Sequence, residues 1–291
     1  MILAGNIFPV RQAREDGRRL PELPLDEELA PSYGAYASFA TPNAPVHTEF
    51  HGDPPALEFD RLLDRFVTPE TDVLDLGCGA GFTLCKIAAG AKSVLGVDLD
   101  ARLIEAAKLR AADRGLHNVS FILGDTVHSA TVGQIPDGAF SLALSRRGPF
   151  LTPALVEKLT PDGLFLVELA QDFLGLKKVF GRTPFLPSSP GDPEPTITYH
   201  AGSGLVPVSA KSYWYEEYFT DADHLGRYLS QGAPLQNWWM EACVFDEDRD
   251  RAALELYARF NTTPHGIRLV GHRRIYLFRR QRTNYYPVVG E

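Results

Sequence analysis

Three glycines at alternate positions, Gly77, Gly79 and Gly81, stand directly after an apolar run that contains an acid, Asp75. Glycine is needed where a backbone turns tightly or must approach a ligand more closely than any Cβ would allow. A second acid, Asp98, closes the next apolar run about 20 residues further on, where a carboxylate can accept hydrogen bonds from ribose hydroxyls. The spacing predicts a nucleotide-binding loop whose ligand lies against main chain.

Strands and helices must alternate along the chain to position these residues. Apolar runs lie at 73–76, with Asp75 inside it, and at 93–100 and 118–125, which each end at an acid, and helix patterns lie between them at 82–90 and 101–114. This alternation is typical of a doubly wound α/β sheet. Asp98 then stands at the tip of the second strand, and a further acid, Asp125, at the end of the third.

The glycine spacing separates two classes of nucleotide-binding protein. In the usual dinucleotide fingerprint of dehydrogenases, the third glycine falls three residues after the second, which is the position of Phe82. In this chain the third glycine comes one place earlier, at Gly81. A tight turn followed by helix caps is the plain alternative, but several strand ends in the right order favour a binding site.

The run 73–81 and the acids around it resemble the motifs of the class I S-adenosylmethionine-dependent methyltransferases. The resemblance covers residues 56 to about 170, and a Pro-x-Gly turn at 161–163 before a strand fits the same family. It implies a Rossmann-like sheet of seven strands, the last antiparallel, with helices on both faces. It also implies a methyltransferase that uses S-adenosylmethionine and releases S-adenosylhomocysteine.

The resemblance assigns roles to the motif residues. Asp75 and the backbone of the glycine loop would hold the methionine end of the cofactor, and Asp98 would take the ribose hydroxyls. Leu99 would lie against the adenine, whose amino group would donate to Asp125. The full set implied for the cofactor is Asp75, Gly77, Cys78, Gly79, Gly81, Asp98, Leu99, Gly124, Asp125, Thr126 and Ser145.

The acceptor side is less defined. The strand 139–144 leads to Ser145–Pro149 at the active-site edge, where Arg146 and Arg147 could bind an acidic substrate or the cofactor carboxylate, or lie on the surface. No Asn/Asp-Pro-Pro-Tyr sequence stands there, which disfavours methylation of a base amine. Tyr33 and Tyr36 are further candidates for the substrate pocket.

A methyl group on a sulfonium is already activated, so the protein must mainly align the acceptor and exclude water. A hydroxyl or protonated amine acceptor would also need a base, for which His51, Glu168 and His200 are weak candidates. No metal is expected, because the cysteines, at 78, 85 and 243, lack metal-ligand spacing.

The segments outside the predicted sheet are the ones expected to form the substrate site. Residues 1–55 are read as an N-terminal extension that caps the active site, and residues 56–291 as the methyltransferase domain. A Pro-rich insertion at about 173–210 is expected to be an irregular, lid-like segment over the carboxyl edge of the sheet. His200 would lie on this segment.

Charge and hydropathy constrain the partners. The net charge of −8 disfavours a broad nucleic-acid surface. Arginines at 273, 274, 279 and 280 bracket the apolar run 275–278. This run is predicted to be the last strand of the sheet, with the arginines in water at its ends; RNA contact by the arginines is the alternative.

No apolar run approaches the roughly 20 residues of a membrane span, and residues 1–19 lack a signal-like core, so a cytoplasmic location is expected.

Three functions stay open at this point. The first is a methyltransferase for a small molecule, which the acidic charge and the lid-like insertion favour. The second is a methyltransferase for RNA or protein, which the arginines near the C-terminus would serve. The third is a protein that binds S-adenosylmethionine or a nucleotide without catalysis. The sequence does not define the oligomeric state.

Overall fold

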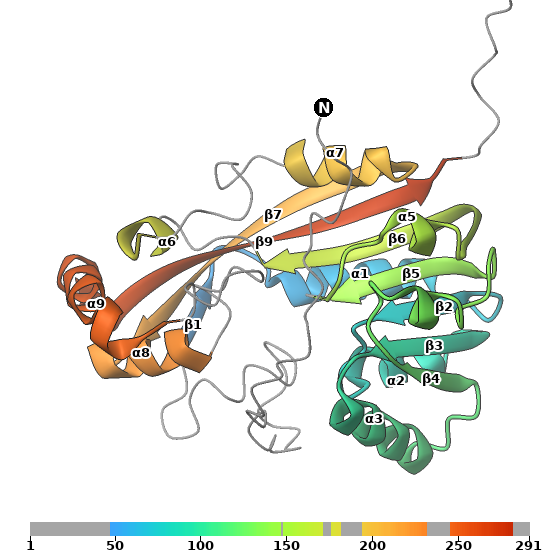
Figure 1. Cartoon of the computed structure of the whole chain (residues 1–291), viewed down its shortest axis with the longest axis horizontal. Helices are drawn as coiled ribbons and strands as arrows, with labels where there is room; N and C mark the ends of the chain where they lie inside the picture. Colours follow the sequence, from blue (N-terminus) through green and yellow to red (C-terminus); the bar gives the residue numbers. More distant parts are fainter. Residues whose placement is uncertain (1–46, 147, 171–175, 182–193, 232–244, 282–291) are drawn as a thin grey trace, which may run out of the picture. The chain divides into compact units, whose positions relative to one another are not determined.

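The computed structural model describes residues 47–146, 148–170, 176–181, 194–231 and 245–281. These ranges contain one mixed sheet with the strand order β1-β7-β9-β6-β5-β2-β3-β4, and β8 pairs with β9 (Figure 1). The chain divides into two compact units. Of the described residues, the glycine-loop unit comprises 55–146, 148–170, 194–212 and 273–281, and the second unit comprises 47–54, 176–181, 213–231 and 245–272.

Parallel strands form the centre of the glycine-loop unit. They are β2 (Asp72–Leu76), β3 (Ser93–Asp98), β4 (Val119–Leu123), β5 (Phe140–Arg146) and β6 (Leu159–Ala170). Each pairs in parallel with its neighbours in the sheet. The long strand β9 (Gly266–Arg280) pairs antiparallel with β6, with Val167 opposite Tyr276. The doubly wound sheet with an antiparallel last strand is therefore confirmed.

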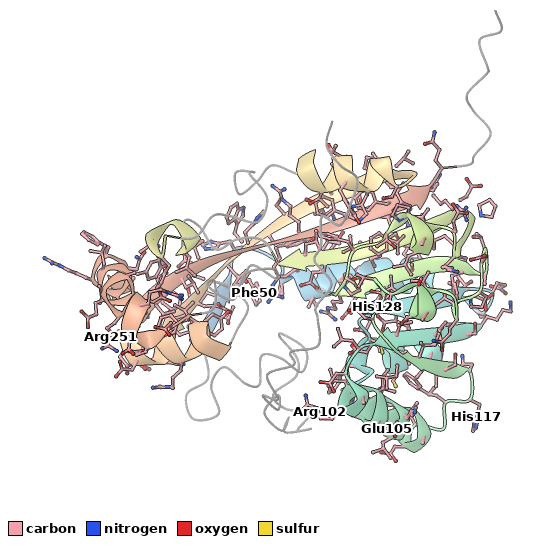
Figure 2. The ribbon with its side chains drawn as sticks, in the orientation of Figure 1. Phe50, Arg102, Glu105, His117, His128 and Arg251 are labelled. Carbon is pink, nitrogen blue, oxygen red and sulfur yellow. The ribbon has the colours of Figure 1, made fainter. Side chains whose placement is uncertain are left out.

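Helices connect these strands. They are α1 (Pro55–Phe66), α2 (Phe82–Ala88), α3 (Ala101–Asp113), α4 (Ser129–Val132), α5 (Pro153–Val156) and α7 (Glu194–Gly202). The start of α3 is fixed by Asp100, whose carboxylate accepts a hydrogen bond from the backbone N–H of Arg102 at 2.9 Å. Arg102 and Glu105, labelled in Figure 2, lie on the exposed side of this helix.

The two faces of the sheet differ in chemistry because side chains alternate along each strand. Leu74, Phe165 and Tyr276 belong to a buried apolar cluster on one face, to which α4 and α5 contribute. The opposite face carries Asp75 and Glu168, and side chains of α1 and α2 pack against it. The apolar face supplies the core, and the charged face is available for the site.

The prediction that the arginines around 275–278 lie in water is wrong for Arg273 and Arg274, whereas Arg279 is exposed as expected. Arg273 and Arg274 are 4% and 2% exposed, and they point to opposite faces of the sheet. Arg273 donates to Glu168 at 3.0 Å, and Arg274 donates to the Tyr276 hydroxyl at 3.2 Å. An Arg-rich sequence therefore lies inside the sheet, because β9 is an interior strand and its partners supply acceptors.

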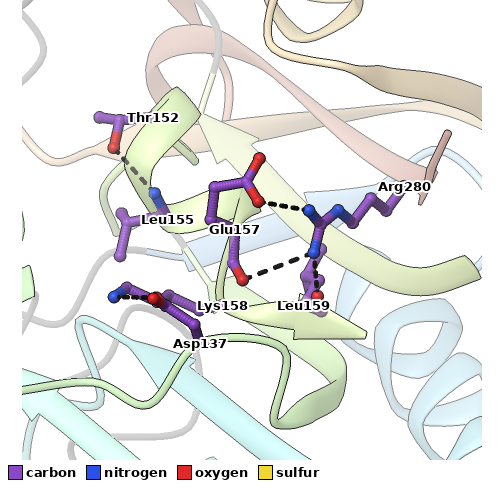
Figure 3. A network of polar contacts seen from close by, with 7 residues as sticks. All are labelled: Asp137, Thr152, Leu155, Glu157, Lys158, Leu159 and Arg280. Carbon is purple, nitrogen blue, oxygen red and sulfur yellow. Dashed lines mark hydrogen bonds and ion pairs between the residues drawn. The ribbon is translucent and has the colours of Figure 1, made fainter. Parts of the chain in front are cut away.

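Arg280 fastens the far end of β9 to the start of β6 (Figure 3). Its guanidinium donates to the backbone carbonyls of Glu157 and Leu159 and pairs with the Glu157 carboxylate at 2.5 Å. Beside it, Lys158 binds Asp137 at 2.5 Å. These contacts hold the antiparallel strand in register at the edge remote from the glycine loop.

The irregular segment expected at about 173–210 is also corrected in part. Residues 194–202 form the helix α7, and the strand β7 (Leu205–Phe219) begins shortly after it. Pro195 is the second residue of α7, in the first turn, where a missing N–H costs nothing. The other prolines of this stretch up to 193 lie outside the described residues, and a lid function stays a prediction.

The second unit has its own apolar core. Its elements are β1 (His47–Phe50), α6 (Leu176–Val179), the 213–219 part of β7, α8 (Ala222–Gln231), α9 (Glu247–Asn261), β8 (Thr262–Thr263) and the 266–272 part of β9. Phe219, Leu225 and Leu254 lie at the centre of the core. Arg251, labelled in Figure 2, joins α9 to α8 through Asp223 at 2.8 Å.

The described sheet exceeds the seven expected strands by β1 and β8. β1 pairs antiparallel with β7, with His47 opposite Tyr218, and β8 pairs with the start of β9. In the described ranges, no helix combines the length and the apolar character that a membrane span needs. The division of the chain into an extension before residue 56 and a single domain after it stays a prediction.

Candidate cofactor site

The glycine loop has the backbone that its sequence predicts. The φ angles of Gly77, Gly79 and Gly81 are 73°, 55° and 79°, a left-handed region that other residues rarely adopt. A Cβ on Gly77 would lie 3.0 Å from Pro149 Cδ, whereas a Cβ on Gly79 would meet no described atom within 4 Å. Gly77 therefore packs against the end of β5, and Gly79 borders open space where a ligand can approach.

Gly81→Ala is expected to reduce the free energy of unfolding by about 2–3 kcal/mol, because strain at φ 79° adds to a collision 2.9 Å from the Ala107 methyl. Urea denaturation measures this loss. Gly115→Ala is the matched control, since Gly115 has φ 64° but open space around its Cα, and it should cost only about 1 kcal/mol. Equal losses in the two variants would show that helix packing at Gly81 is unimportant.

Asp98 lies beside the glycine loop and is hydrogen-bonded to it. Its carboxylate accepts hydrogen bonds from the backbone N–H of Gly79 at 2.8 Å and of Asp100 at 2.9 Å. Burial raises the pKa of Asp98 despite these bonds. The structure thus places this acid at the tip of β3, beside the glycine loop, where the resemblance locates the ribose.

Asp75 is the least satisfied acid of the site. It is 2% exposed, and its Oδ2 atom is buried without a hydrogen-bond partner in the described part of the chain. Burial, reinforced by the nearby charge of Asp98 and opposed by that of Arg146, raises the pKa of Asp75 to about 7. A buried carboxylate oxygen without a hydrogen-bond donor reduces the stability of the protein when no ligand is bound. A cationic ligand group would supply the missing donor and charge.

The residues implied for the adenine lie after β3 and β4. Leu99 is 46% exposed, so its side chain is open to contact with a ligand. Gly124 donates its N–H to the Asp98 carbonyl at 2.9 Å, and its missing side chain makes room for Thr131. Asp125 accepts from the N–H of Val127 at 3.1 Å. An exposed apolar side chain next to a carboxylate fits a flat, amino-bearing ring.

Three of the residues implied for the cofactor, Ser145, Cys78 and Thr126, have side chains that are buried within the protein. The Ser145 hydroxyl donates to the Pro149 carbonyl at 2.8 Å, so it shapes the turn after β5. The Cys78 thiol lies against the position of Gly96, and burial raises its pKa. Thr126 is 6% exposed. These residues shape the site, and their direct contact with a cofactor stays a prediction.

A line of charged side chains crosses the site face of the sheet, and we call it the charge row. Its members stand on neighbouring strands in the order β3, β2, β5, β6 and β9, and they are Asp98, Asp75, Arg146, Glu168 and Arg273. Register places them on one face, because Asp75 pairs with Leu144 and Arg146 pairs with Glu168. Acids and arginines alternate from Asp75 onward, so each charge has an opposite neighbour.

The ion pairs of the row are close. The fully buried Glu168 accepts from Arg146 at 3.0 Å and from Arg273 at 3.0 Å. Arg146 also lies 3.9 Å from Asp60 of α1 and 5.2 Å from the centre of the Phe59 ring. Glu168 is therefore bound by two guanidinium groups within the protein, and its use as a base stays a prediction.

The other predicted base candidates lie elsewhere. His200 is fully buried on the apolar face, stacked on Phe278 at 4.6 Å, and burial lowers its pKa to about 4. The structure does not bring it to the charge row, because Phe278 and Phe165 belong to the opposite face. His51 belongs to the second unit and lies 3.2 Å from Glu216. Tyr33, Tyr36 and Arg147 lie outside the described residues.

Sequence reasoning missed three residues that shape the site. Arg110 of α3 donates to the Ala80 carbonyl and stacks on Phe82 at 3.5 Å, which clamps the glycine loop. Asp60 and Arg273 complete the surroundings of Arg146 and Glu168. Their helix or strand positions are visible in the sequence, but their partners come from elements distant in the chain, and no local pattern identifies them.

Residues 68–168 match a family described as a methyltransferase domain. The match spans the glycine loop, Asp98, Asp125 and the strand that carries Glu168. Together with the fold, it shows that the chain contains a class I S-adenosylmethionine-dependent methyltransferase domain. The resemblance seen in the sequence and the expected methyl donor of the family are confirmed.

Individual relatives agree on the domain and differ in their substrates. The nocamycin O-methyltransferase of Saccharothrix syringae is 34% identical over 35% of this chain and 39% of its own length. A ribosomal protein L11 methyltransferase of Symbiobacterium thermophilum is 29% identical over 52% of this chain and 48% of its own. This chain thus spans half or less of the length of these relatives.

A solved structure extends the likeness of the fold. A protein of unknown function from Deinococcus radiodurans R1 superposes with a TM-score of 0.57 at 20% identity, over 82% of this chain and 92% of that protein. At this identity the similarity concerns the fold alone.

Proposed function

We propose that this protein transfers the methyl group of S-adenosylmethionine to a small-molecule acceptor by in-line displacement. The observation that carries the cofactor assignment is the buried, unpartnered Oδ2 atom of Asp75 beside the glycine loop. An ammonium group is the complement that removes the cost of this carboxylate. The α-amino group of S-adenosylmethionine is such a group.

The residues of the site fit the rest of this cofactor. Asp75 would bind the amino group, and the open space at Gly79 would admit the methionine end close to main chain. Asp98 would exchange its bond to the Gly79 N–H for a ribose hydroxyl or share it, and Leu99 would cover the adenine. When bound, S-adenosylmethionine supplies a methyl group on a positively charged sulfur.

Several observations support a small acceptor over RNA. Three of the four arginines named for RNA contact are used within the fold, since Arg273 and Arg274 are buried and Arg280 binds main-chain carbonyls, and Arg279 alone of the four is exposed. The net charge of −8 adds repulsion from phosphates. The similarity to nocamycin O-methyltransferase also favours a small acceptor. A protein acceptor is the second candidate, favoured by the similarity to the ribosomal protein L11 methyltransferase.

Two measurements test this proposal. Calorimetric titration with S-adenosylmethionine, S-adenosylhomocysteine and NADH should show binding of the first two alone; binding of NADH alone would overturn the cofactor assignment. Methyl transfer from labelled cofactor is then measured to separated small-molecule, RNA and protein fractions. Label in the protein fraction alone would replace the proposed acceptor class, and tight binding without transfer to any fraction would favour the non-catalytic alternative. A cytoplasmic location and the use of His51 as a base stay predictions.

Cofactor affinity is expected to rise about fivefold to tenfold between pH 6 and pH 7.5. The reason is that Asp75, whose pKa is raised to about 7, must lose its proton to bind an ammonium, and the raised pKa of Asp98 acts in the same direction. Calorimetry in two buffers of different ionisation enthalpy measures the affinity and the proton released. An affinity that is constant over this range would show that neither acid titrates on binding.

A further inference from the structure

Arg146 has an unusual place in the charge row. It stands at the end of β5, on the same face as Asp75 of the neighbouring strand and two residues beyond Leu144, the register partner of Asp75. In the described part of the chain no hydrogen bond or ion pair joins the two side chains. Arg146 is instead bound to Glu168 at 3.0 Å and lies 3.9 Å from Asp60, with its side chain 20% exposed.

We propose that Arg146 is a positioning residue of the cofactor site. Its charge favours the ionised form of Asp75, which binds the ammonium group of the cofactor, and Glu168, Arg273 and Asp60 hold Arg146 in place. This inference rests on the proposed function. In this proposal Arg146 acts on Asp75 through its charge, across the face of the sheet. It makes no contact of its own with the substrate or the cofactor.

The charges around Asp75 decide the sign of this effect. Asp98 from β3 opposes ionisation of Asp75. The thiols of Cys78 in the loop and Cys85 in α2 are neutral neighbours, because burial raises the pKa of each. Arg146 from β5 favours ionisation and lowers the pKa of Asp75. From the helices on this face, Lys86 of α2 and Asp60 of α1 bind each other at 2.8 Å. Arg146 is thus the cation that offsets Asp98.

The mobility of Arg146 is limited by its partners. Glu168 is fully buried and bound by Arg273 from the other side, so its carboxylate cannot swing away without leaving a buried guanidinium. Phe59 lies under the Arg146 guanidinium at 5.2 Å. These contacts fix the long, flexible side chain of Arg146 at the end of its strand. A fixed position keeps the distance to Asp75, and with it the electrostatic interaction, constant.

The test compares the cofactor affinity of the wild-type protein with that of Arg146→Gln at pH 6, 7 and 8. If Arg146 acts through the ionisation of Asp75, the affinity of the variant is about tenfold lower at pH 6 but only about twofold lower at pH 8, because Asp75 is ionised at high pH in both proteins. Direct binding of the cofactor carboxylate by Arg146, or a merely structural role, would give the same loss at every pH and would overturn the inference.

Further variants and a second ligand keep the result unambiguous. Arg146→Lys retains the charge and should restore the wild-type pH profile. Glu168→Gln removes a negative neighbour of Arg146 and should shift the profile in the opposite direction, to lower pH. 5′-Methylthioadenosine, which lacks the amino-acid end, should bind the wild type and Arg146→Gln equally; a loss of its affinity would indicate a distorted site.

The apo protein supplies a readout that does not depend on the cofactor. Because the pKa of Asp75 is raised to about 7 in the folded state, stability falls as pH rises from about 4 to about 7, and Arg146→Gln should extend the upper end of this fall by about one pH unit. An unmoved stability profile overturns the inference even if the protein binds no S-adenosylmethionine. Absence of binding in the wild type, with a shifted stability profile, would instead overturn the proposed function alone.

Discussion

Asp75→Asn is expected to weaken S-adenosylmethionine binding about 30- to 150-fold and to stabilise the apo protein at pH 8. The loss of affinity corresponds to about 2–3 kcal/mol for a hydrogen bond between charged groups. The gain in stability, about 1–3 kcal/mol, arises because a carboxylate whose pKa is raised to about 7 costs folding energy above that pH, and an amide carries no charge. Calorimetry and thermal melting measure the two effects.

The sign of the stability change depends on pH. Between pH 4 and 7 the folded wild-type protein holds the Asp75 proton more tightly than the unfolded chain, so its stability decreases as pH rises through this range. The advantage of Asp75→Asn should therefore vanish near pH 4 and be complete by pH 8. A variant that is less stable than the wild type at pH 8 would contradict the idea of an unsatisfied buried charge.

Asp72, at the other end of β2, is the matched control for Asp75. Hydrogen bonds from Lys92 at 2.8 Å and Ser93 at 2.5 Å lower its pKa, which is the opposite direction. Asp72→Asn should leave cofactor affinity unchanged and should slightly destabilise the protein at neutral pH. Weakened cofactor binding in this variant would mean that any loss of charge in the strand disturbs the loop.

Glu168→Ala is expected to lower the free energy of unfolding by about 3–5 kcal/mol. The substitution removes the buried carboxylate that Arg146 and Arg273 share, and breaking a buried ion pair by removing one partner is strongly destabilising. Urea denaturation at pH 7 measures the loss. Glu157→Ala provides the comparison, because its carboxylate is 64% exposed and its pair with Arg280 should contribute less than about 1 kcal/mol. Similar losses in the two variants would refute a central role for Glu168.

The local part of the site could be predicted from the sequence. The glycines at 77, 79 and 81 required left-handed backbone, and all three adopt it. Asp75 and Asp98 stand at the ends of neighbouring strands, as the apolar runs indicated. These features depend on residues close together in the chain, where spacing alone fixes the geometry.

The non-local part could not be predicted in this way. The run around 273–280 has the composition of an exposed basic strand, but it is placed between β6 and β7, where its arginines meet acceptors from remote elements. His200 appeared to lie in a polar loop, yet α7 turns its ring onto Phe165 and Phe278. Burial of a polar residue depends on its sheet and helix neighbours, which the linear pattern does not contain.

The strand order has a consequence for synthesis of the chain. β9 lies between β6 and β7 in the sheet, although it follows both in sequence. While the ribosome is still making residues 266–280, β6 presents an unpaired edge, and β7 has no strand through which to join the rest of the sheet. The nascent protein therefore carries an open sheet edge until almost the last of the described residues has emerged, and an unpaired edge is a template for pairing with other chains.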